Sequence, residues 1–336
     1  MKNRTPCGTS TAQSLVRFTL AALCAASLSG CNAKNEETGG PAAAPNSSSK
    51  PSDVISEVPT TGKTFLVGVS LRDQSAFDTA MRKAMEATAA HIQLTLDVQS
   101  ADSDPRKQAQ QVEAFIEEKT DAILLCPATP EAANGAIGHA NAAKIPVFAA
   151  LLSPHTGAIV SLIASDDAQS GQKAAQALAA LLHEKGALAL LGSSNRAVSG
   201  PTQGFQAEIA KHPGIKILAD TAGTDRPDAA RSAISRYGRQ LNGFFCLNDT
   251  ATTAAIVACH QAQRPDIQVV GYDADAPQRD EKRPDANLKA VVLPLPEKIG
   301  ARAITVLADY LRRKNVAPPP IVRVAPGIVD LTGAKR

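Results

Sequence analysis

Side chains that could catalyse a reaction do not occur here in the spacings that enzymes use. Gly192-Ser193-Ser194 lacks the second glycine of the nucleophile elbow found in many hydrolases. Gly62-Lys63-Thr64 lacks the upstream glycine of a phosphate-binding loop. The histidines show no ligand spacing, and the sequence contains no CxxC pair or Cys/His cluster that would predict zinc. The sequence therefore favours binding over catalysis, and we expect no cofactor and no metal.

The residues before Cys31 follow the plan of an export signal. Three basic residues precede an apolar run over residues 18–28, which is too short to span a bilayer, and small residues follow it. Leu28-Ser29-Gly30-Cys31 resembles a bacterial lipobox. The resemblance implies that residues 1–30 are a lipoprotein signal peptide and that the Cys31 thiol carries a lipid. We then expect an anchored protein on the periplasmic or other extracytoplasmic face of a membrane. An ordinary secretory signal with an incidental cysteine is the alternative.

Charge, length and cysteine content narrow the class of the mature protein. The formal net charge is +3, and the signal alone holds three basic and no acidic residues, so the mature chain is close to neutral. A nucleic-acid partner, which would need a basic surface, is not indicated. Residues 31–336 exceed the usual size of one compact domain, which favours two lobes. Of the three remaining cysteines, Cys126 and Cys246 lie in apolar strand-like runs, where we expect them to be buried.

The pattern of the chain changes sharply near residue 62. Residues 31–62 are rich in Ala, Pro, Ser and Gly, which predicts a disordered tether. Residues 64–70 then form an apolar run without polar alternation, typical of a strand buried on both faces. Helical spacing begins at Phe77. Alternation continues with strands at 92–98, 121–126, 145–150 and 159–164 and helices at 106–119 and 130–142.

A second series of the same kind begins after Ser165-Asp166-Asp167, a helix N-cap sequence. It comprises a helix ending near Lys185, strands at 187–191, 215–220, 243–247, 267–271 and 291–293, and helices at 200–211, 227–239 and 249–261. A final helix covers residues 295–314. We therefore predict an α/β fold with two doubly wound parallel-sheet lobes joined by a hinge of several crossings. The first lobe would hold residues 63–164 and 295–320, and the second 165–294 and 321–336. The ligand would lie at the carboxyl ends of the strands.

Short strings along the chain occur in the order and spacing of one known family. They are Ile163-Ala164-Ser165-Asp166, Gly204-Phe205, Phe245-Cys246-Leu247-Asn248-Asp249, Val270-Gly271-Tyr272-Asp273, and Leu295-Pro296 before Ile299-Gly300. Over residues 64–330 the chain resembles the periplasmic sugar-binding proteins of the ribose-binding type, which share their fold with the effector domains of Lac-repressor-like regulators. The resemblance implies the type I periplasmic binding protein fold, a ligand that closes the cleft, and docking of the loaded protein on a permease or a sensor.

The family's ligand residues transfer unevenly to this chain. Asn248 and Asp273 match an asparagine and an aspartate that bond sugar hydroxyls from the second lobe. Phe77 matches an aromatic residue that stacks on the sugar ring, and Gln74 matches the polar residue of the first loop. Cys126 stands where the family has an asparagine. The resemblance implies that these five residues line the ligand site.

Other family positions have lost their polar groups. Ala76 replaces a second aromatic residue, Ala150-Leu151 an Asp-Arg pair, Pro201 an arginine and Pro294 a glutamine. A buried sugar hydroxyl without a partner costs about 1–3 kcal/mol, so these changes argue against ribose itself. Three loop residues face the same cleft in this interpretation and could supply substitutes: Arg72, Asn195 and Arg196. A solvated surface charge is the alternative role for the two arginines.

Structural roles are the alternatives for these residues. Asn248 or Asp249 could cap the helix that follows them, and we expect Asp249 to be the cap and Asn248 to contact the ligand. Asp273 could instead bond a neighbouring turn. Phe77 could be a core residue at the tip of its helix.

The resemblance implies a lipid-anchored, monomeric solute-binding protein of an ABC importer that captures a small polar ligand, such as a sugar, by hinge closure. We expect it to perform no chemistry. A ligand-presenting accessory of a sensor kinase or chemoreceptor is the alternative, and an enzyme on the same fold is a more distant one. A transcription regulator would need a DNA-binding helix pair where this chain has its signal and tether. Ligand, membrane leaflet and partner are left open by the sequence.

Overall fold

The computed structural model describes residues 64–131, 133–192, 200–220, 226, 228–272, 285–313 and 316–332. These residues belong to one compact unit that extends from Pro59 to Arg336. The expected signal peptide, the lipidation residue Cys31 and the tether up to residue 62 lie outside the described residues. Within the described ranges, we find no helix with the length and apolar character that a membrane span requires.

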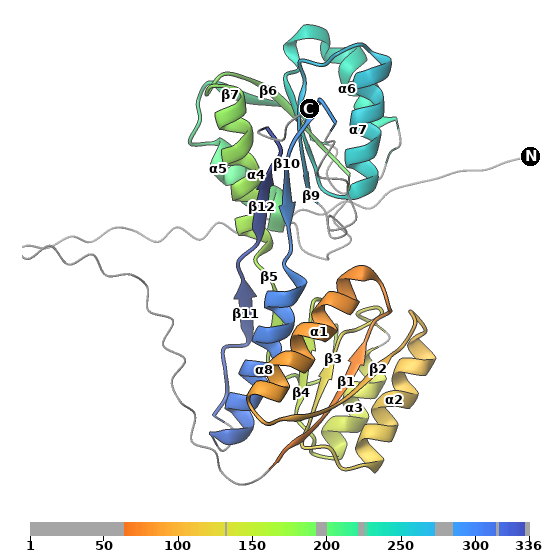
Figure 1. Cartoon of the computed structure of the whole chain (residues 1–336). Helices are drawn as coiled ribbons and strands as arrows, with labels where there is room; N and C mark the ends of the chain where they lie inside the picture. Colours follow the sequence, from red (N-terminus) through yellow and green to blue (C-terminus); the bar gives the residue numbers. More distant parts are fainter. Residues whose placement is uncertain are drawn as a thin grey trace, which may run out of the picture. The chain divides into compact units, whose positions relative to one another are not determined.

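The first lobe is a six-stranded parallel sheet with helices on both faces (Figure 1). Its strand order is β11-β5-β4-β3-β1-β2. The strands are β1 (Leu66–Leu71), β2 (Thr95–Ser100), β3 (Ala122–Leu125), β4 (Val147–Ala150), β5 (Leu162–Ser165) and β11 (Ile321–Val324). The helices are α1 (Ala76–His91), α2 (Pro105–Glu117), α3 (Ala133–Ala142) and α8 (Pro296–Arg312).

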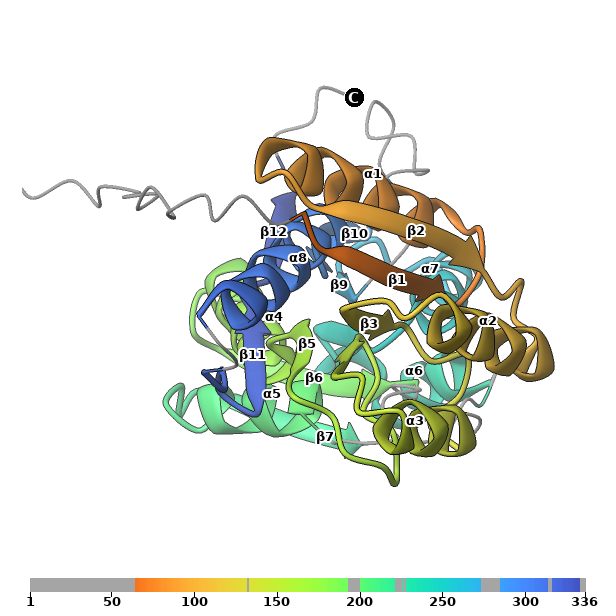
Figure 2. The same cartoon turned by 90° about the horizontal axis from the view of Figure 1, so that it is seen from below.

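The two faces of this sheet have separate apolar cores. Figure 2 shows α1 and α8 on one face and α2 and α3 on the other. Met81 and Met85 of α1 pack with Ile304 of α8 in one core, and Phe115 of α2 packs with Ile137 of α3 in the other. Gly300 of α8 permits a close approach of the two helices, because a Cβ there would lie 2.5 Å from the Met81 carbonyl oxygen. This is the doubly wound arrangement that the alternating pattern predicts.

The second lobe repeats the design with one antiparallel strand. Its strand order is β12-β10-β9-β8-β6-β7, in which only β12 runs antiparallel, against β10. The strands are β6 (Gly186–Leu191), β7 (Ile215–Asp220), β8 (Gly243–Cys246), β9 (Gln268–Tyr272), β10 (Leu288–Leu293) and β12 (Gly327–Asp330). The helices are α4 (Asp167–Leu181), α5 (Gly200–Ile209), α6 (Ala229–Tyr237) and α7 (Asp249–Gln261), and a 3-10 turn, η1 (Gly238–Gln240), follows α6.

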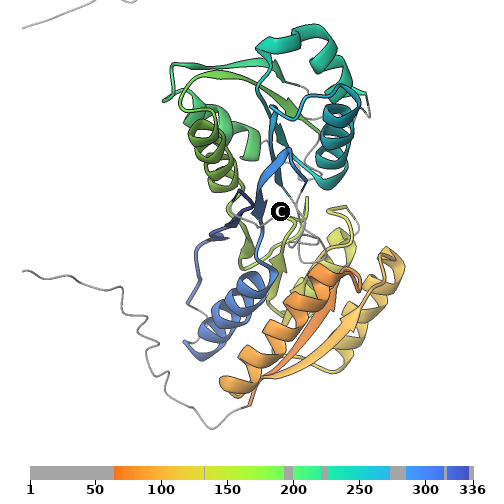
Figure 3. The same cartoon turned by 45° about the horizontal axis from the view of Figure 1, so that its top comes forward.

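Helices cover both faces of the second sheet too. In Figure 3 the green α4 and α5 lie on one side of this sheet and the teal α6 and α7 on the other. Phe205 of α5 stacks on Phe245 of β8 with a centroid separation of 4.7 Å, inside the core beneath α4 and α5. Gly204 lies against the Ala168 carbonyl group of α4, where a Cβ would clash. Each lobe therefore has a sheet and a core of its own.

The chain passes between the two sheets three times. The crossings follow β5 at Asp166, β10 at Pro294, and β11 at Ala325. The expected lobe boundary at residue 320 needs correction, because β11 pairs with β5 and belongs to the first sheet, so the last crossing lies between Val324 and Gly327. Sequence reasoning did not identify β11 or β12 as strands, since both are short edge strands in which exposed and less exposed residues alternate.

Candidate functional site

The residues expected to bind the ligand follow strands at the carboxyl edges of both sheets. Gln74 and Phe77 follow β1, Cys126 follows β3 and Asn248 follows β8. Because parallel strands end at the same edge, the fold brings the first three to one edge of the first sheet. Asp273, which comes directly after β9, lies outside the described residues, as do Asn195 and Arg196. Their contact with a ligand stays a prediction.

A cluster of charged side chains lies in the loop between β1 and α1. Arg72 Nε donates to Asp73 Oδ2 at 3.1 Å, and Arg72 Nη2 donates to Asp78 Oδ1, also at 3.1 Å. The second carboxylate oxygen of Asp78 accepts the backbone N–H of Asp73 at 3.0 Å. Asp73 Oδ1 accepts the backbone N–H of Ser75, whose hydroxyl in turn caps α1 by accepting from the Asp78 N–H. The loop is thus held by a closed set of hydrogen bonds.

The two carboxyl groups of this cluster have opposite pKa shifts. The side chain of Asp78 is fully buried, and this burial raises its pKa to about 6, although the charge on Arg72 acts in the opposite direction. Burial also acts upward on the pKa of Asp73, but hydrogen bonds from Ser75 and the charge on Arg72 outweigh it and hold that pKa below its ordinary value. Sequence reasoning named Arg72 as a substitute and missed Asp78, which occupies a helix position that the pattern does not mark as buried.

Gln74 is exposed, and a hydrogen bond to Asp102, just beyond the end of β2, orients its side chain. Its Nε2 donates to Asp102 Oδ1 at 2.6 Å. Asp102 also accepts from the Lys107 ammonium group and the Ser100 hydroxyl, and hydrogen bonds from Lys107, Gln74 and Ser100 lower its pKa to about 2. The side-chain amide nitrogen of Gln74 therefore already bonds a residue of the loop that follows β2. A ligand contact through its carbonyl oxygen stays a prediction.

Phe77 and Cys126 are buried rather than presented to solvent. Phe77 is 5% exposed and belongs to the apolar core under α1 and α8, which agrees with its alternative role as a core residue. Cys126 is 0% exposed in the same core, and burial together with the charge on Asp78 raises the pKa of its thiol. A ligand contact by either side chain stays a prediction, and their burial counts against it.

A buried polar network that the sequence did not predict supports the same edge. Ser70 Oγ donates to Gln111 Oε1 at 2.7 Å, and Gln111 Nε2 donates to the Ser100 carbonyl oxygen at 2.8 Å. Gln108 Nε2 donates to the Cys126 carbonyl oxygen at 2.9 Å. The two glutamines of α2 thereby join the ends of β1, β2 and β3. Their spacing of three residues predicts that they share one face of the helix, but it does not predict their burial or their partners.

Asn248 caps α7, and the expectation that Asp249 would be the cap was wrong. Asn248 has extended backbone angles of −158° and 172°, and its Oδ1 accepts the Ala251 N–H at 2.7 Å. Asp249 is already the first residue of the helix, where it cannot occupy the cap position. The side-chain amide of Asn248 lies near Gly192 at the end of β6, since a Cβ on Gly192 would stand 3.2 Å from Asn248 Nδ2. A ligand contact through that amide stays a prediction.

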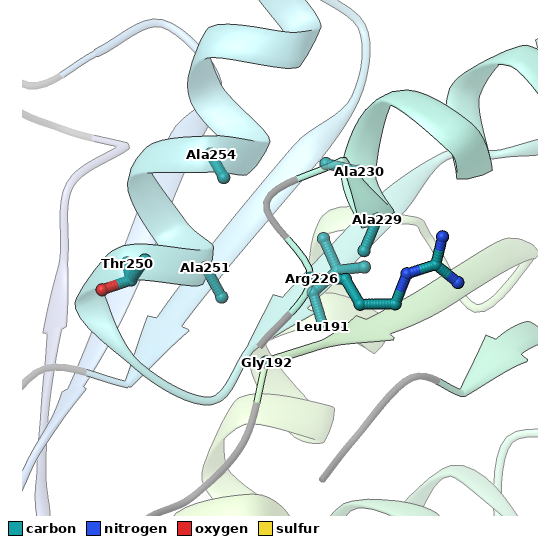
Figure 4. A pocket seen from close by; sticks show the side chains of 8 residues that line it. All are labelled: Leu191, Gly192, Arg226, Ala229, Ala230, Thr250, Ala251 and Ala254. Atoms are coloured by element: carbon teal, nitrogen blue, oxygen red, sulfur yellow. The ribbon is translucent and has the colours of Figure 1, made fainter. Parts of the chain in front are cut away.

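A small apolar cavity lies beside this cap, at the carboxyl end of β6. Figure 4 shows the alanine side chains of α6 and α7 facing each other across it, with Arg226 at its rim. Its volume of about 30 Å³ is far too small for a sugar. The lining residues are Leu191, Gly192, Arg226, Ala229, Ala230, Thr250, Ala251 and Ala254.

Two larger hollows lie away from the carboxyl edges. One of about 580 Å³ includes Asp121 and Pro146, which come just before β3 and β4 and so mark the amino edge of the first sheet. The other, of about 650 Å³, lies between α4 and the edge strand β12. Within the described ranges no three His, Cys, Asp or Glu side chains are grouped so that they could hold a metal ion. The carboxyl edges are therefore the candidate site.

Comparisons with known proteins identify the family of the chain. Residues 67–315 match the model of the family described as "Periplasmic binding protein domain". The chain is 31% identical over 268 residues to the D-apiose import binding protein of Actinobacillus succinogenes, covering 77% of this chain and 84% of that protein. It is 30% identical over 215 residues to the xylitol-binding protein of Mycolicibacterium smegmatis, covering 62% of this chain and 61% of that protein. An ABC transporter solute-binding protein from Agrobacterium vitis, solved with α-D-tagatopyranose, has a TM-score of 0.62 and 25% identity over 80% of this chain and 95% of its own.

Proposed function

Because the chain belongs to the periplasmic binding protein family, we propose that it is the solute-binding protein of an ABC importer and captures a sugar or polyol outside the cytoplasmic membrane. The observation that carries this proposal is the pair of doubly wound sheets joined by three crossings, in a chain whose relatives are named as import binding proteins. The relatives are binding proteins of transporters rather than enzymes, and capture without chemistry is part of the proposal.

Hinge closure is the mechanism that this topology supports. Each lobe has its own sheet and core, so a change of torsion angles at the crossings can move one lobe without disturbing either core. Pro294 restricts one crossing, because its ring fixes the backbone φ angle. Arg72 and Gln74 would meet the ligand from the first lobe. Asn248 and Asp273 would meet it from the second.

The membrane connection belongs to the proposal as well. Cys31 would carry the lipid and residues 31–62 would give the folded unit reach from the membrane surface. We propose that the protein acts as a monomer that docks on the permease. A sensor accessory would use the same capture step, but no observation favours that partner.

A thermal-shift screen tests the capture of sugars and polyols. The full chain, purified in detergent, is heated with D-apiose, xylitol, D-tagatose and D-ribose in turn. Binding stabilises the folded state by about 2.7 kcal/mol when the ligand is at a hundredfold excess over Kd, so a specific ligand raises Tm in a dose-dependent way. We expect D-ribose to be weaker than the best compound, because the family's ribose contacts at Ala150, Leu151, Pro201 and Pro294 are missing. A flat response to all four compounds would reject the proposed function.

A further inference from the structure

Arg72 is the one cationic residue in the stretches that directly follow the strands of the first sheet, and Lys107, in the first turn of α2 at the same edge, is paired with Asp102. Among the three residues that follow each of its six strands, all within the described part of the chain, Arg72 is the only arginine or lysine. The family's Asp-Arg pair falls on Ala150-Leu151 at the end of β4, and neither residue is charged. A charged hydrogen-bond donor for a ligand at this edge can therefore come from Arg72.

The guanidinium group of Arg72 is held by two carboxylates and is partly exposed. Nε uses its hydrogen to bond Asp73, and Nη2 uses one of its two hydrogens to bond Asp78. An arginine carries five N–H donors, so three have no acceptor within the described residues. The Arg72 side chain is 31% exposed, whereas that of Asp78 is fully buried. The buried carboxylate thus fixes a donor group that is itself partly exposed.

The charge of this cluster selects the kind of ligand. Arg72 contributes one positive charge, and Asp73 and Asp78 together contribute two negative charges, so the ionised cluster is net negative. An anionic ligand would meet a guanidinium whose charge is already more than balanced. A neutral ligand with neighbouring hydroxyl groups can still accept the three remaining N–H donors.

We propose that Arg72, oriented by the buried Asp78, donates hydrogen bonds to neighbouring hydroxyl groups of an uncharged sugar or polyol, and that the same cluster disfavours sugar phosphates and sugar acids. This inference rests on the proposed function and assigns its ligand class. Arg72 is the ligand contact, and Asp78 is a positioning residue that acts through it.

Asp78 needs both of its oxygens for this role. Oδ1 accepts from Arg72 and Oδ2 accepts the backbone N–H of Asp73, so the two donors require two acceptors. An asparagine of the same shape offers only one acceptor and places an NH2 group against the other donor. Asp78→Asn therefore releases either the guanidinium or the loop backbone, with little change in side-chain volume.

Calorimetric titration of the full chain with xylitol and D-apiose tests the contact. We expect Arg72→Ala to weaken the binding of whichever compound binds the wild type by about tenfold to a hundredfold, since charged donors make the stronger hydrogen bonds. Asp78→Asn should weaken it by a smaller factor. In the Arg72→Ala background Asp78→Asn should have no further effect, which separates positioning through Arg72 from a general structural role. Arg72→Lys keeps the charge but loses the planar guanidinium group with its several N–H donors. Its affinity should therefore lie between those of Arg72→Ala and the wild type.

Arg82→Ala is the matched control, because Arg82 pairs with Glu86 on the exposed side of α1. It should leave Kd unchanged within about a factor of two and should not shift Tm measurably. The inference is overturned if Arg72→Ala binds as the wild type does, or if the effects of Arg72→Ala and Asp78→Asn simply add. Tighter wild-type binding of D-ribose 5-phosphate than of either neutral compound overturns the ligand class. If xylitol and D-apiose do not bind, the titrations use whichever of D-tagatose and D-ribose raises Tm in the thermal-shift screen, and a flat response to all four compounds rejects the proposed function and this inference with it.

Discussion

Leu295 lies against Gly327, so two of the three crossings between the lobes are in contact. A Cβ on Gly327 would stand 3.1 Å from Leu295 Cδ2. Leu295 precedes α8, and Gly327 begins β12, where it pairs with Leu293 of β10. The absence of a side chain at Gly327 leaves room for Leu295 at the point where the chain changes sheets. The Leu295 side chain thus packs against the Gly327 backbone, and these two hinge segments contact each other.

Filling this space should destabilise the protein. We expect Gly327→Val to lower the free energy of unfolding by about 1–3 kcal/mol, since its methyl groups would displace Leu295. Leu295→Ala in the same chain should recover part of that loss. Urea unfolding measures both effects. Gly135→Ala on α3, where the new Cβ would meet no atom within 4 Å, is the control and should be neutral or stabilising. Equal behaviour of Gly327→Val and Gly135→Ala would contradict the packed hinge.

The buried carboxyl of Asp78 should give the protein a pH-dependent stability. Its pKa is about 6 in the folded state against an ordinary value of 3.8, so between these values the folded state holds a proton that the unfolded state has released. This contribution to stability is therefore present below pH 4, falls as the pH rises, and is lost above about pH 6. Its size is on the order of 1–3 kcal/mol.

Urea unfolding of the wild type and of Asp78→Asn between pH 4 and pH 7 isolates this effect. Since asparagine does not titrate, the variant should gain stability relative to the wild type as the pH rises through this window. The neighbouring groups Arg72, Asp73 and Cys126 are present in both proteins. A difference between the two proteins that stays constant with pH would show that Asp78 has an ordinary pKa.

Loss of Gln108 should weaken the carboxyl edge of the first sheet. Gln108 is 2% exposed and satisfies both the Cys126 carbonyl group and the Ala128 N–H. We expect Gln108→Ala to cost about 1–3 kcal/mol of unfolding free energy, because the buried Cys126 carbonyl group and the partly buried Ala128 N–H lose their partner. Chemical denaturation measures the cost. The exposed Gln110 on the same helix provides the control, and Gln110→Ala should change stability by less than about 0.5 kcal/mol. An effect of Gln108→Ala no larger than that of Gln110→Ala would refute the network's role.

Cys31→Ser should release the protein from the membrane. If the Cys31 thiol carries the lipid, the wild type partitions into the detergent phase, whereas the variant stays in the aqueous phase because the acyl chains supply the binding energy. Phase separation with a nonionic detergent, together with the intact mass of the mature N-terminus, measures this. Cys259→Ser is the control, because Cys259 is buried in the second lobe and its loss should leave partitioning unchanged. Identical partitioning of Cys31→Ser and wild type, with no acyl mass, would rule out the anchor.

Most of the fold could be predicted because its signals are local. The bounds of β7 (Ile215–Asp220) and α7 (Asp249–Gln261) agree with the sequence prediction. Apolar residues around Ile217 mark the strand, and a polar cap marks the start of the helix. β11 carried no such signal. It is a four-residue strand whose neighbour β5 lies far away in sequence, and only the pairing of Val322 with Ile163 and its neighbours assigns it to the first lobe.

The candidate site divides in the same way. The positions of Gln74 and Asn248 at strand ends follow from the sequence alone, because a strand pattern followed by a helix pattern places the intervening loop at the carboxyl edge. The role of Asn248 as the cap of α7 needed the backbone angles, because the sequence offers two adjacent residues able to cap. The roles of Asp78 and Gln108 needed the tertiary structure. Their burial depends on partners such as Arg72 and the Cys126 carbonyl group, and a helical pattern does not record which polar side chain finds a buried partner across the fold.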